Sequence, residues 1–179
     1  MSAFEYLFTF FGLLLGLAAA NVATGFADMW RDRRQTTVGI CTPILALCVL
    51  LGAMNLWLRF WNSRDAMTLD AWHLIWVTCL ALPYVFLSRG MFSGAGGATS
   101  LEAHYLAHRR VMLAALAAPA LVSLVQTVLS HGEVPLNWNT IWMGLRVVTP
   151  LLLIPFASAT VQRIGLAGIA SLLVLGLFR

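Results

Sequence analysis

Long apolar blocks alternate along the chain with short connections that carry most of the charged residues. The blocks have roughly 17 to 25 residues, enough for a helix rising 1.5 Å per residue to cross a hydrocarbon core about 30 Å thick. The pattern predicts six transmembrane helices, at about 4–26, 37–60, 71–88, 109–130, 140–157 and 162–178. We therefore expect an all-α, polytopic integral membrane protein, with one transmembrane domain over residues 1–179 and no soluble domain.

The first block differs from a secretory signal peptide. It has no basic segment before its apolar run, it contains Glu5, and no small-residue cleavage site precedes a polar mature start. We expect this block to be retained as the first transmembrane helix.

Composition excludes several function classes. Apolar residues make up 60% of the chain and charged residues only 10%, which rules out an ordinary water-soluble domain. All 11 basic residues are arginine, so no lysine can form a Schiff base or serve a phosphate-binding loop. The three cysteines lie in apolar segments without metal-ligand spacing. The arginines lie at the ends of the predicted helices and not on one soluble face, as they would in a nucleic-acid-binding protein.

The arginines predict how the chain crosses the membrane. Seven fall on one side of the six predicted helices and three on the other, which by the positive-inside rule makes the arginine-rich side cytoplasmic. Both termini are then periplasmic, in the inner membrane of a bacterium. The seven are Arg31, Arg33, Arg34, Arg89, Arg109, Arg110 and Arg163, and the three are Arg59, Arg64 and Arg179.

Tryptophans gather at the opposite, outer ends of the predicted helices. They form three pairs with four-residue spacing, which places both rings of each pair on one helix face: Trp57 and Trp61, Trp72 and Trp76, and Trp138 and Trp142. Indole rings favour the headgroup level, so the pairs indicate an aromatic belt. A second interpretation is an aromatic-lined outer mouth that contacts a ligand or partner.

Small residues recur at four-residue spacing in the first predicted helix, at Gly12, Gly16 and Ala20. Such spacing lets two helix backbones approach closely in lipid. We expect this face to pack within the subunit or to join it to a second copy or to other membrane subunits.

Arg146 is the clearest case of a charged residue inside a predicted helix. It lies about 9 Å along the fifth helix, deep enough to need a partner or a route to the interface. The topology gathers Glu5, Arg59, Asp70, His73, His131 and Glu133 on the same outer side. We interpret Arg146 as the selecting charge of an ion or solute pathway, with Glu5 or Glu133 as its counter-ion; a structural salt bridge is the alternative.

Two asparagines, Asn21 and Asn55, lie inside predicted helices. Their amides can hydrogen-bond between helices or coordinate a cation on the same pathway. The segment from Thr99 to Glu102 fits a capping box that opens a helix, which predicts that the fourth helix begins before its apolar block.

Histidines provide two weaker hypotheses. His73 and His131 lie at the outer ends of neighbouring helices and could hold a haem b between them. His104 and His108, four residues apart on one helix face, could share a metal ion, although the sequence offers no clear third ligand. We otherwise expect no cofactor.

No catalytic residue is predicted. Neither paired aspartates, a serine–histidine pair nor a zinc-protease motif occurs in the predicted helices, so an enzyme is the less favoured class. We expect an oligomeric channel or transporter for a small ion or solute. The alternatives are a non-catalytic membrane scaffold or complex subunit, and a haem b redox protein.

Overall fold

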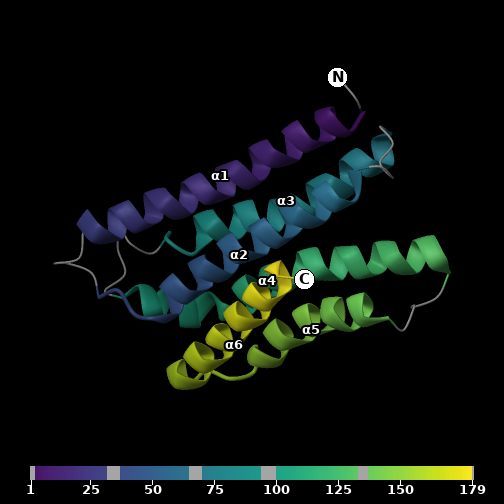
Figure 1. Cartoon of the computed structure of the whole chain (residues 1–179). Coiled ribbons are helices and arrows are strands. Elements are labelled where there is room, and N and C mark those ends of the chain that lie inside the picture. Colours follow the sequence, from purple (N-terminus) through teal and green to yellow (C-terminus); the bar gives the residue numbers. More distant parts are fainter. Residues whose placement is uncertain (1–2, 32–36, 65–69, 94–99, 133–136, 179) are drawn as a thin grey trace.

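The computed structural model describes residues 3–31, 37–64, 70–93, 100–132 and 137–178, which form six helices joined in antiparallel succession (Figure 1). The helices are α1 (Ala3–Arg31), α2 (Cys41–Asn62), α3 (Ala71–Gly90), α4 (Leu101–His131), α5 (Trp138–Leu153) and α6 (Ala159–Leu177). The predicted all-helical membrane fold is confirmed.

Five of the six helices are long and apolar enough to span a bilayer: α1, α2, α3, α4 and α6. The exception is α5, whose 16 residues extend about 24 Å. We predicted that this helix continues to residue 157, but it ends at Leu153. Pro155 explains the early end, because it has no backbone N–H to donate to the preceding turn, while Ile154 before it still has helical dihedrals and bonds Leu151 O.

The central helix of the bundle is α2. In the most apolar 18-residue stretch of α2, 61% of the residues are buried inside the protein, against 28–33% in the corresponding stretches of the other candidate membrane spans. It packs against α1, α3, α4 and α6, while α1 also packs on α3, α4 on α5, and α5 on α6. Polar residues on the inner faces of α2 therefore meet side chains from several helices.

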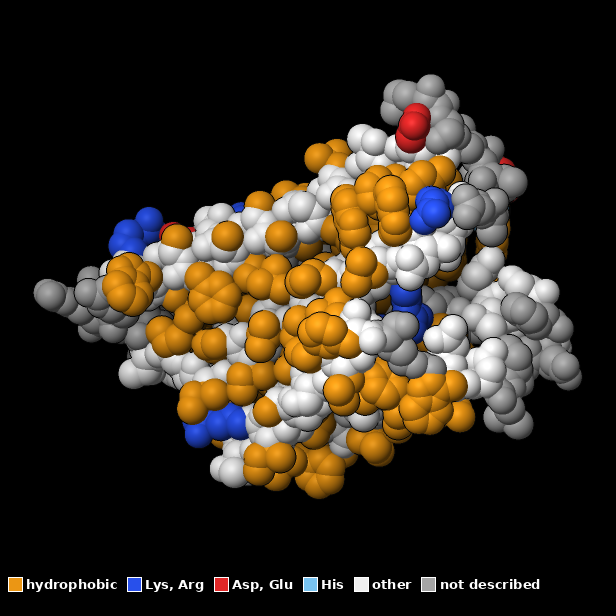
Figure 2. All heavy atoms as spheres, viewed as in Figure 1, with side chains coloured by type: hydrophobic (Ala, Val, Ile, Leu, Met, Phe, Trp, Pro, Cys, Tyr) orange, Lys and Arg blue, Asp and Glu red, His pale blue; other side chains and the backbone are white. Residues whose placement is uncertain are grey.

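Apolar side chains cover most of the visible face, and the basic and acidic side chains gather toward its two ends (Figure 2). This distribution is typical of a protein with an apolar belt in lipid and charged groups near water. We call the end where α2 ends and α3 begins the Arg59 end, and the end where α4 begins the Glu102 end.

At the Glu102 end, α4 begins close to the predicted capping box, but the capping group differs. Ser100 caps the helix by accepting a hydrogen bond from Ala103 N at 3.4 Å. Our prediction of a Thr99–Glu102 box is therefore wrong. The Glu102 carboxylate instead accepts two hydrogen bonds from Arg163 Nη2, at 2.8 and 3.0 Å, and joins α4 to α6.

A buried amide holds the turn between α5 and α6. Gln162 has no exposed surface. Its Nε2 donates to the carbonyls of Leu153 and Phe156 at 2.7 and 2.6 Å, and its Oε1 accepts from the Tyr105 hydroxyl at 2.7 Å. These bonds add a partner to carbonyls where α5 ends, one of which, Leu153 O, also accepts from Phe156 N at 3.2 Å, and they fix both helices to α4.

We predict that Gln162→Leu destabilises the protein by about 1–3 kcal/mol, because the tyrosine hydroxyl and two carbonyls lose buried partners. Thermal unfolding of the purified protein in detergent measures the change. Thr160→Leu is the matched control, since Thr160 is exposed on the same helix. Equal unfolding temperatures for the two variants would contradict the role given to Gln162.

Candidate functional site

Arg146 and Asn55 meet at the centre of the candidate site. Nη2 of Arg146, on α5, donates a hydrogen bond to Oδ1 of Asn55, on α2. Nδ2 of Asn55 donates to the carbonyls of Leu51 at 2.9 Å and of Leu173, on α6, at 2.8 Å. One buried amide therefore connects α2, α5 and α6, and it orients the guanidinium.

Gly176 provides the space for this guanidinium. A Cβ at position 176 would collide with Arg146 Nη2 and would lie 2.7 Å from Asn55 Oδ1 and 3.1 Å from Trp142 Nε1. The absence of a side chain on α6 at this point allows the charge to reach Asn55.

The surroundings of Arg146 are short of negative charge. Among the described residues no carboxylate pairs with it, and its Nε is buried without a hydrogen-bond partner. Arg59, one helical turn beyond Asn55 on α2, adds a second positive charge nearby. A buried donor that lacks an acceptor costs about 1–3 kcal/mol, so this site favours an acceptor from outside the described side chains.

A small cavity of about 30 Å³ adjoins the two arginines, with room for a water molecule or two. Tyr84 reaches into it over Gly52, where an added Cβ would lie 2.6 Å from the tyrosine hydroxyl. Two prolines within helices, Pro119 and Pro150, also line it. A proline removes one helix hydrogen bond, so α4 and α5 are both weakened beside the cavity.

A larger space opens from the cavity toward the Arg59 end. We call it the vestibule; it has a volume of about 880 Å³ and is lined by residues of α2, α3, α4, α5 and α6 and by Ser63 and Asn137. Four residues line both spaces: Leu56, Arg59, Ser123 and Met143. Its other polar lining residues are Asn55, Asn62, Ser63, Gln126, Thr127, Asn137 and Asn139, and its aromatic ones are Phe60, Trp76, Trp138 and Trp142.

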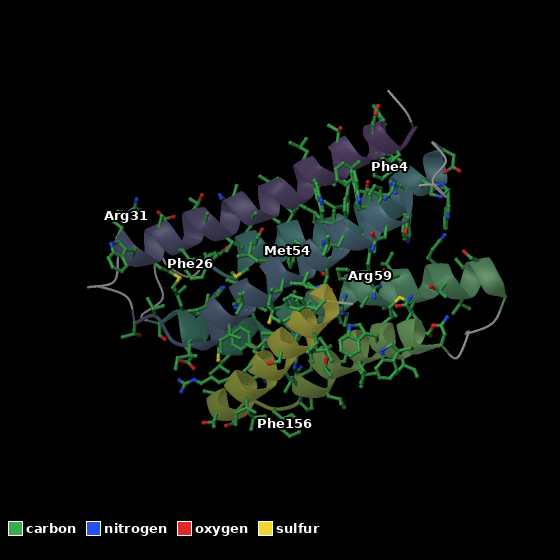
Figure 3. All side chains as sticks on the ribbon, in the orientation of Figure 1. Phe4, Phe26, Arg31, Met54, Arg59 and Phe156 are labelled. Atoms are coloured by element: carbon green, nitrogen blue, oxygen red, sulfur yellow. The ribbon has the colours of Figure 1, made fainter. Side chains whose placement is uncertain are left out.

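The vestibule lies where α6 no longer covers the bundle. Figure 1 shows that α2 and α4 continue beyond the end of α6, and Figure 2 shows a hollow with a basic side chain on the same face. In Figure 3, Arg59 is labelled beside the outer end of α6. None of the described residues that line the vestibule carries a carboxylate.

The structure brings together only some of the residues that we predicted for the pathway. Arg146 lies against Asn55 and does not pair with Glu5, which is exposed in the first turn of α1. Asp70 caps α3, accepting from His73 N at 2.7 Å and lying 2.8 Å from His73 Nδ1. Glu133 lies outside the described residues.

Asn21 is remote from this site. Its Nδ2 donates to Ser88 Oγ at 3.2 Å and connects α1 to α3. Both predicted intramembrane amides therefore make hydrogen bonds between helices, but only Asn55 also contacts an arginine.

The histidine hypotheses stay predictions. His73 and His131 are at the Arg59 end of α3 and α4, and the side chain of His131 lies outside the described part. The rings of His104 and His108 lie 4.5 Å apart, centroid to centroid, and His104 Nε2 is 3.1 Å from Gly90 O. Among the described residues, no group of three or more His, Cys, Asp or Glu side chains is arranged to hold a metal ion.

The small residues of α1 divide into two groups. Gly12 packs inside the subunit, since a Cβ there would lie 2.8 Å from the Trp57 ring. Gly16 has open space around it, and Ala20 is exposed. Close packing within the subunit accounts for Gly12, and contact with another chain stays a prediction for the other two.

Comparison with protein-family models, with curated proteins and with solved structures finds no match to this chain.

Sequence reasoning missed Tyr84, Gln126 and Gly176. A tyrosine or glutamine in an apolar helix is a weak signal of a shared cavity, because the sequence does not give the rotation of one helix against another. The tryptophan pairs were the informative signal, since Trp138, Trp142 and Trp76 do line the vestibule.

We predict that Asn55→Leu destabilises the protein and that adding Arg146→Leu recovers part of the loss. The single variant leaves a buried guanidinium without its acceptor, whereas the double variant removes both groups. We expect a coupling of at least about 0.6 kcal/mol in a double-mutant cycle, measured by unfolding in detergent. Arg110→Leu, at an exposed position on α4, is the control second substitution, and equal recovery by both would contradict the pairing.

Proposed function

We propose that this membrane protein is a transporter for a small anionic solute, with Arg146 as the charge that selects it. The observation that carries the proposal is the partner of Arg146: its guanidinium is held by an amide rather than by a carboxylate among the described residues. A positive charge oriented by a neutral group keeps its attraction for an anion. A salt bridge would have cancelled that attraction.

The second arginine supports the same solute class. Arg59 lines both the cavity and the vestibule, so an anion entering from the Arg59 end meets Arg59 first and Arg146 deeper. Arg146, at the deeper position, has no carboxylate partner among the described residues. The site therefore favours an anion over a neutral or cationic solute.

A transporter fits the packing better than a permanently open pore. On the side of the cavity toward the Glu102 end, the core is closed by apolar side chains with little or no exposure, including Leu45, Cys48, Leu113 and Leu166. Passage therefore requires the helices to move. The prolines of α4 and α5 beside the cavity are places where these helices bend at low cost.

The proposal keeps the predicted orientation. The Glu102 end carries Arg31, Arg89, Arg109, Arg110 and Arg163 among the described residues, and an excess of arginine favours the cytoplasmic side. The vestibule then opens toward the periplasm of a bacterial inner membrane. Self-assembly stays a prediction. The proposed transport through this site does not require a second copy of the chain.

Uptake into proteoliposomes tests the function. We expect the purified protein to take up at least one radiolabelled anion from a panel of chloride, acetate and inorganic phosphate, with sodium ions as the charge control. Arg146→Ala should lower that uptake by at least about tenfold, since a charge-assisted hydrogen bond contributes about 1.5–3 kcal/mol. Arg110→Ala should transport like the unmodified protein.

Absence of uptake of every anion, in vesicles that contain folded protein, would reject transport and favour a scaffold. Uptake that Arg146→Ala leaves unchanged would remove this arginine from the mechanism.

We also predict that Gly176→Ala lowers anion uptake while the protein remains folded. The added Cβ would collide with Arg146 Nη2 and lie 2.7 Å from Asn55 Oδ1, so the guanidinium moves away from Asn55 and the protein loses the aligned charge together with some stability. Gly168→Ala is the matched control on the same helix, because a Cβ there has nothing within 4 Å. Equal uptake by the two variants would contradict the positioning role of Gly176.

A further inference from the structure

The small cavity holds two hydrogen-bond donors that have no acceptor in the described part of the chain. Arg146 and Tyr84 both line it. Nε of Arg146 is buried without a hydrogen-bond partner, while Nη2 of the same guanidinium is bound to Asn55. The Tyr84 side chain is buried, and its hydroxyl donates no hydrogen bond to a described residue. Buried polar groups are normally hydrogen-bonded, so the cavity favours an occupant that accepts from these donors.

The two donors lie close together because they meet neighbouring turns of one helix. On α2, Gly52 precedes Asn55 by three residues, about 4.5 Å along the axis, and the two positions share a helix face. The Tyr84 hydroxyl lies over Gly52, where an added Cβ would be 2.6 Å from it. The Arg146 guanidinium is bound to Asn55. The hydroxyl from α3 and the guanidinium from α5 therefore reach the same cavity about one helical turn apart.

The rest of the lining favours a negatively charged occupant. Most of the other lining residues are apolar, and several of them are buried, including Leu116, Ile169 and Leu173. No described lining residue carries a carboxylate. A charge inside a protein is normally paired, and its attraction for an opposite charge is stronger among apolar groups than in water. An anion therefore satisfies Arg146 better than a neutral acceptor does.

The size of the cavity limits which anion fits. Its volume is about 30 Å³. Since about 10–15 Å³ is enough for one water molecule, the cavity has room for roughly two water-sized atoms. A halide ion is a single atom, whereas acetate and phosphate each contain several non-hydrogen atoms. The cavity therefore accommodates a halide without displacement of its walls and is too small for the larger anions.

We infer that the small cavity binds one halide ion, with chloride as the test case, between the Arg146 guanidinium and the Tyr84 hydroxyl. The inference rests on the proposed function and deepens it, since it names the class of anion that Arg146 selects. Arg146 supplies the charge, and Tyr84 donates a hydrogen bond to the ion. The ion reaches the cavity from the vestibule, because the two spaces adjoin and share lining residues.

Uptake into proteoliposomes tests the role of Tyr84. We expect chloride uptake to exceed acetate and phosphate uptake by at least about tenfold. Tyr84→Phe keeps the ring and removes the donor, so it should lower chloride uptake by at least about tenfold, as expected for loss of one hydrogen bond to a charged group. Tyr6→Phe is the matched control, because Tyr6 is exposed on α1. This control should transport like the unmodified protein.

Thermal unfolding in detergent measures halide binding separately from transport. A ligand that binds the folded protein raises its unfolding temperature as the ligand concentration increases. At constant ionic strength, sodium chloride should raise this temperature to a plateau, and sodium gluconate, whose anion is too large for the cavity, should not. In Tyr84→Phe, the chloride concentration that gives half of the rise should increase by at least about tenfold. Equal unfolding temperatures in the two salts would indicate that the cavity holds only water and would overturn the inference.

The two experiments distinguish failure of the inference from failure of the proposed function. Uptake of acetate or phosphate that depends on Arg146 and exceeds chloride uptake would overturn the halide inference and leave the proposed function standing. Chloride binding that depends on Tyr84, without uptake of any anion, would support the inference and reject transport. Chloride uptake and binding that Tyr84→Phe leaves unchanged would overturn the assignment of the halide to this cavity.

Discussion

A guanidinium inside a bilayer must find hydrogen-bond acceptors, and this constraint organises the half of the protein around Arg146. The acceptor is Asn55, and the same amide is bound to the backbone of α6 through Leu173. Gly176 is required beside it because any side chain there would take the place of the charge. One amide and one arginine therefore link α2, α5 and α6, in addition to the apolar packing between these helices.

The other half of the bundle is held by polar groups that pair with one another. Glu102 and Arg163 form a salt bridge with two hydrogen bonds from one nitrogen, and Gln162 uses both its amide nitrogen and its oxygen. Arg146 is not paired in this way, because its Nε lacks an acceptor among the described groups. The contrast is between polar groups at the Glu102 end that pair with one another and a guanidinium that keeps one donor without an acceptor among the described groups.

The sequence was sufficient to predict the helices, but not which polar side chains of different helices contact each other. Apolar blocks of membrane length predicted all six helices, because a single spanning segment in lipid satisfies its backbone hydrogen bonds by forming a helix. Depth along a helix also identified Arg146 as unusual. Its partner was not predictable in the same way, because Asn55 lies 91 residues away in the sequence. Opposite charge favoured Glu5 as the partner. In the structure, the rotation of the helices and the space at Gly176 bring the guanidinium to the Asn55 amide instead. At Glu102, likewise, a local capping pattern was overridden by an arginine 61 residues away.

The short length of α5 has a consequence for the membrane itself. A helix of about 24 Å is shorter than a hydrocarbon core of about 30 Å, while its neighbour α4 has 31 residues. Lipids beside such a helix compress to hide the mismatch, and the bilayer thins locally. Thinning on the α5 side brings the polar surface nearer to Arg146 and so lowers the cost of holding this charge inside the bilayer.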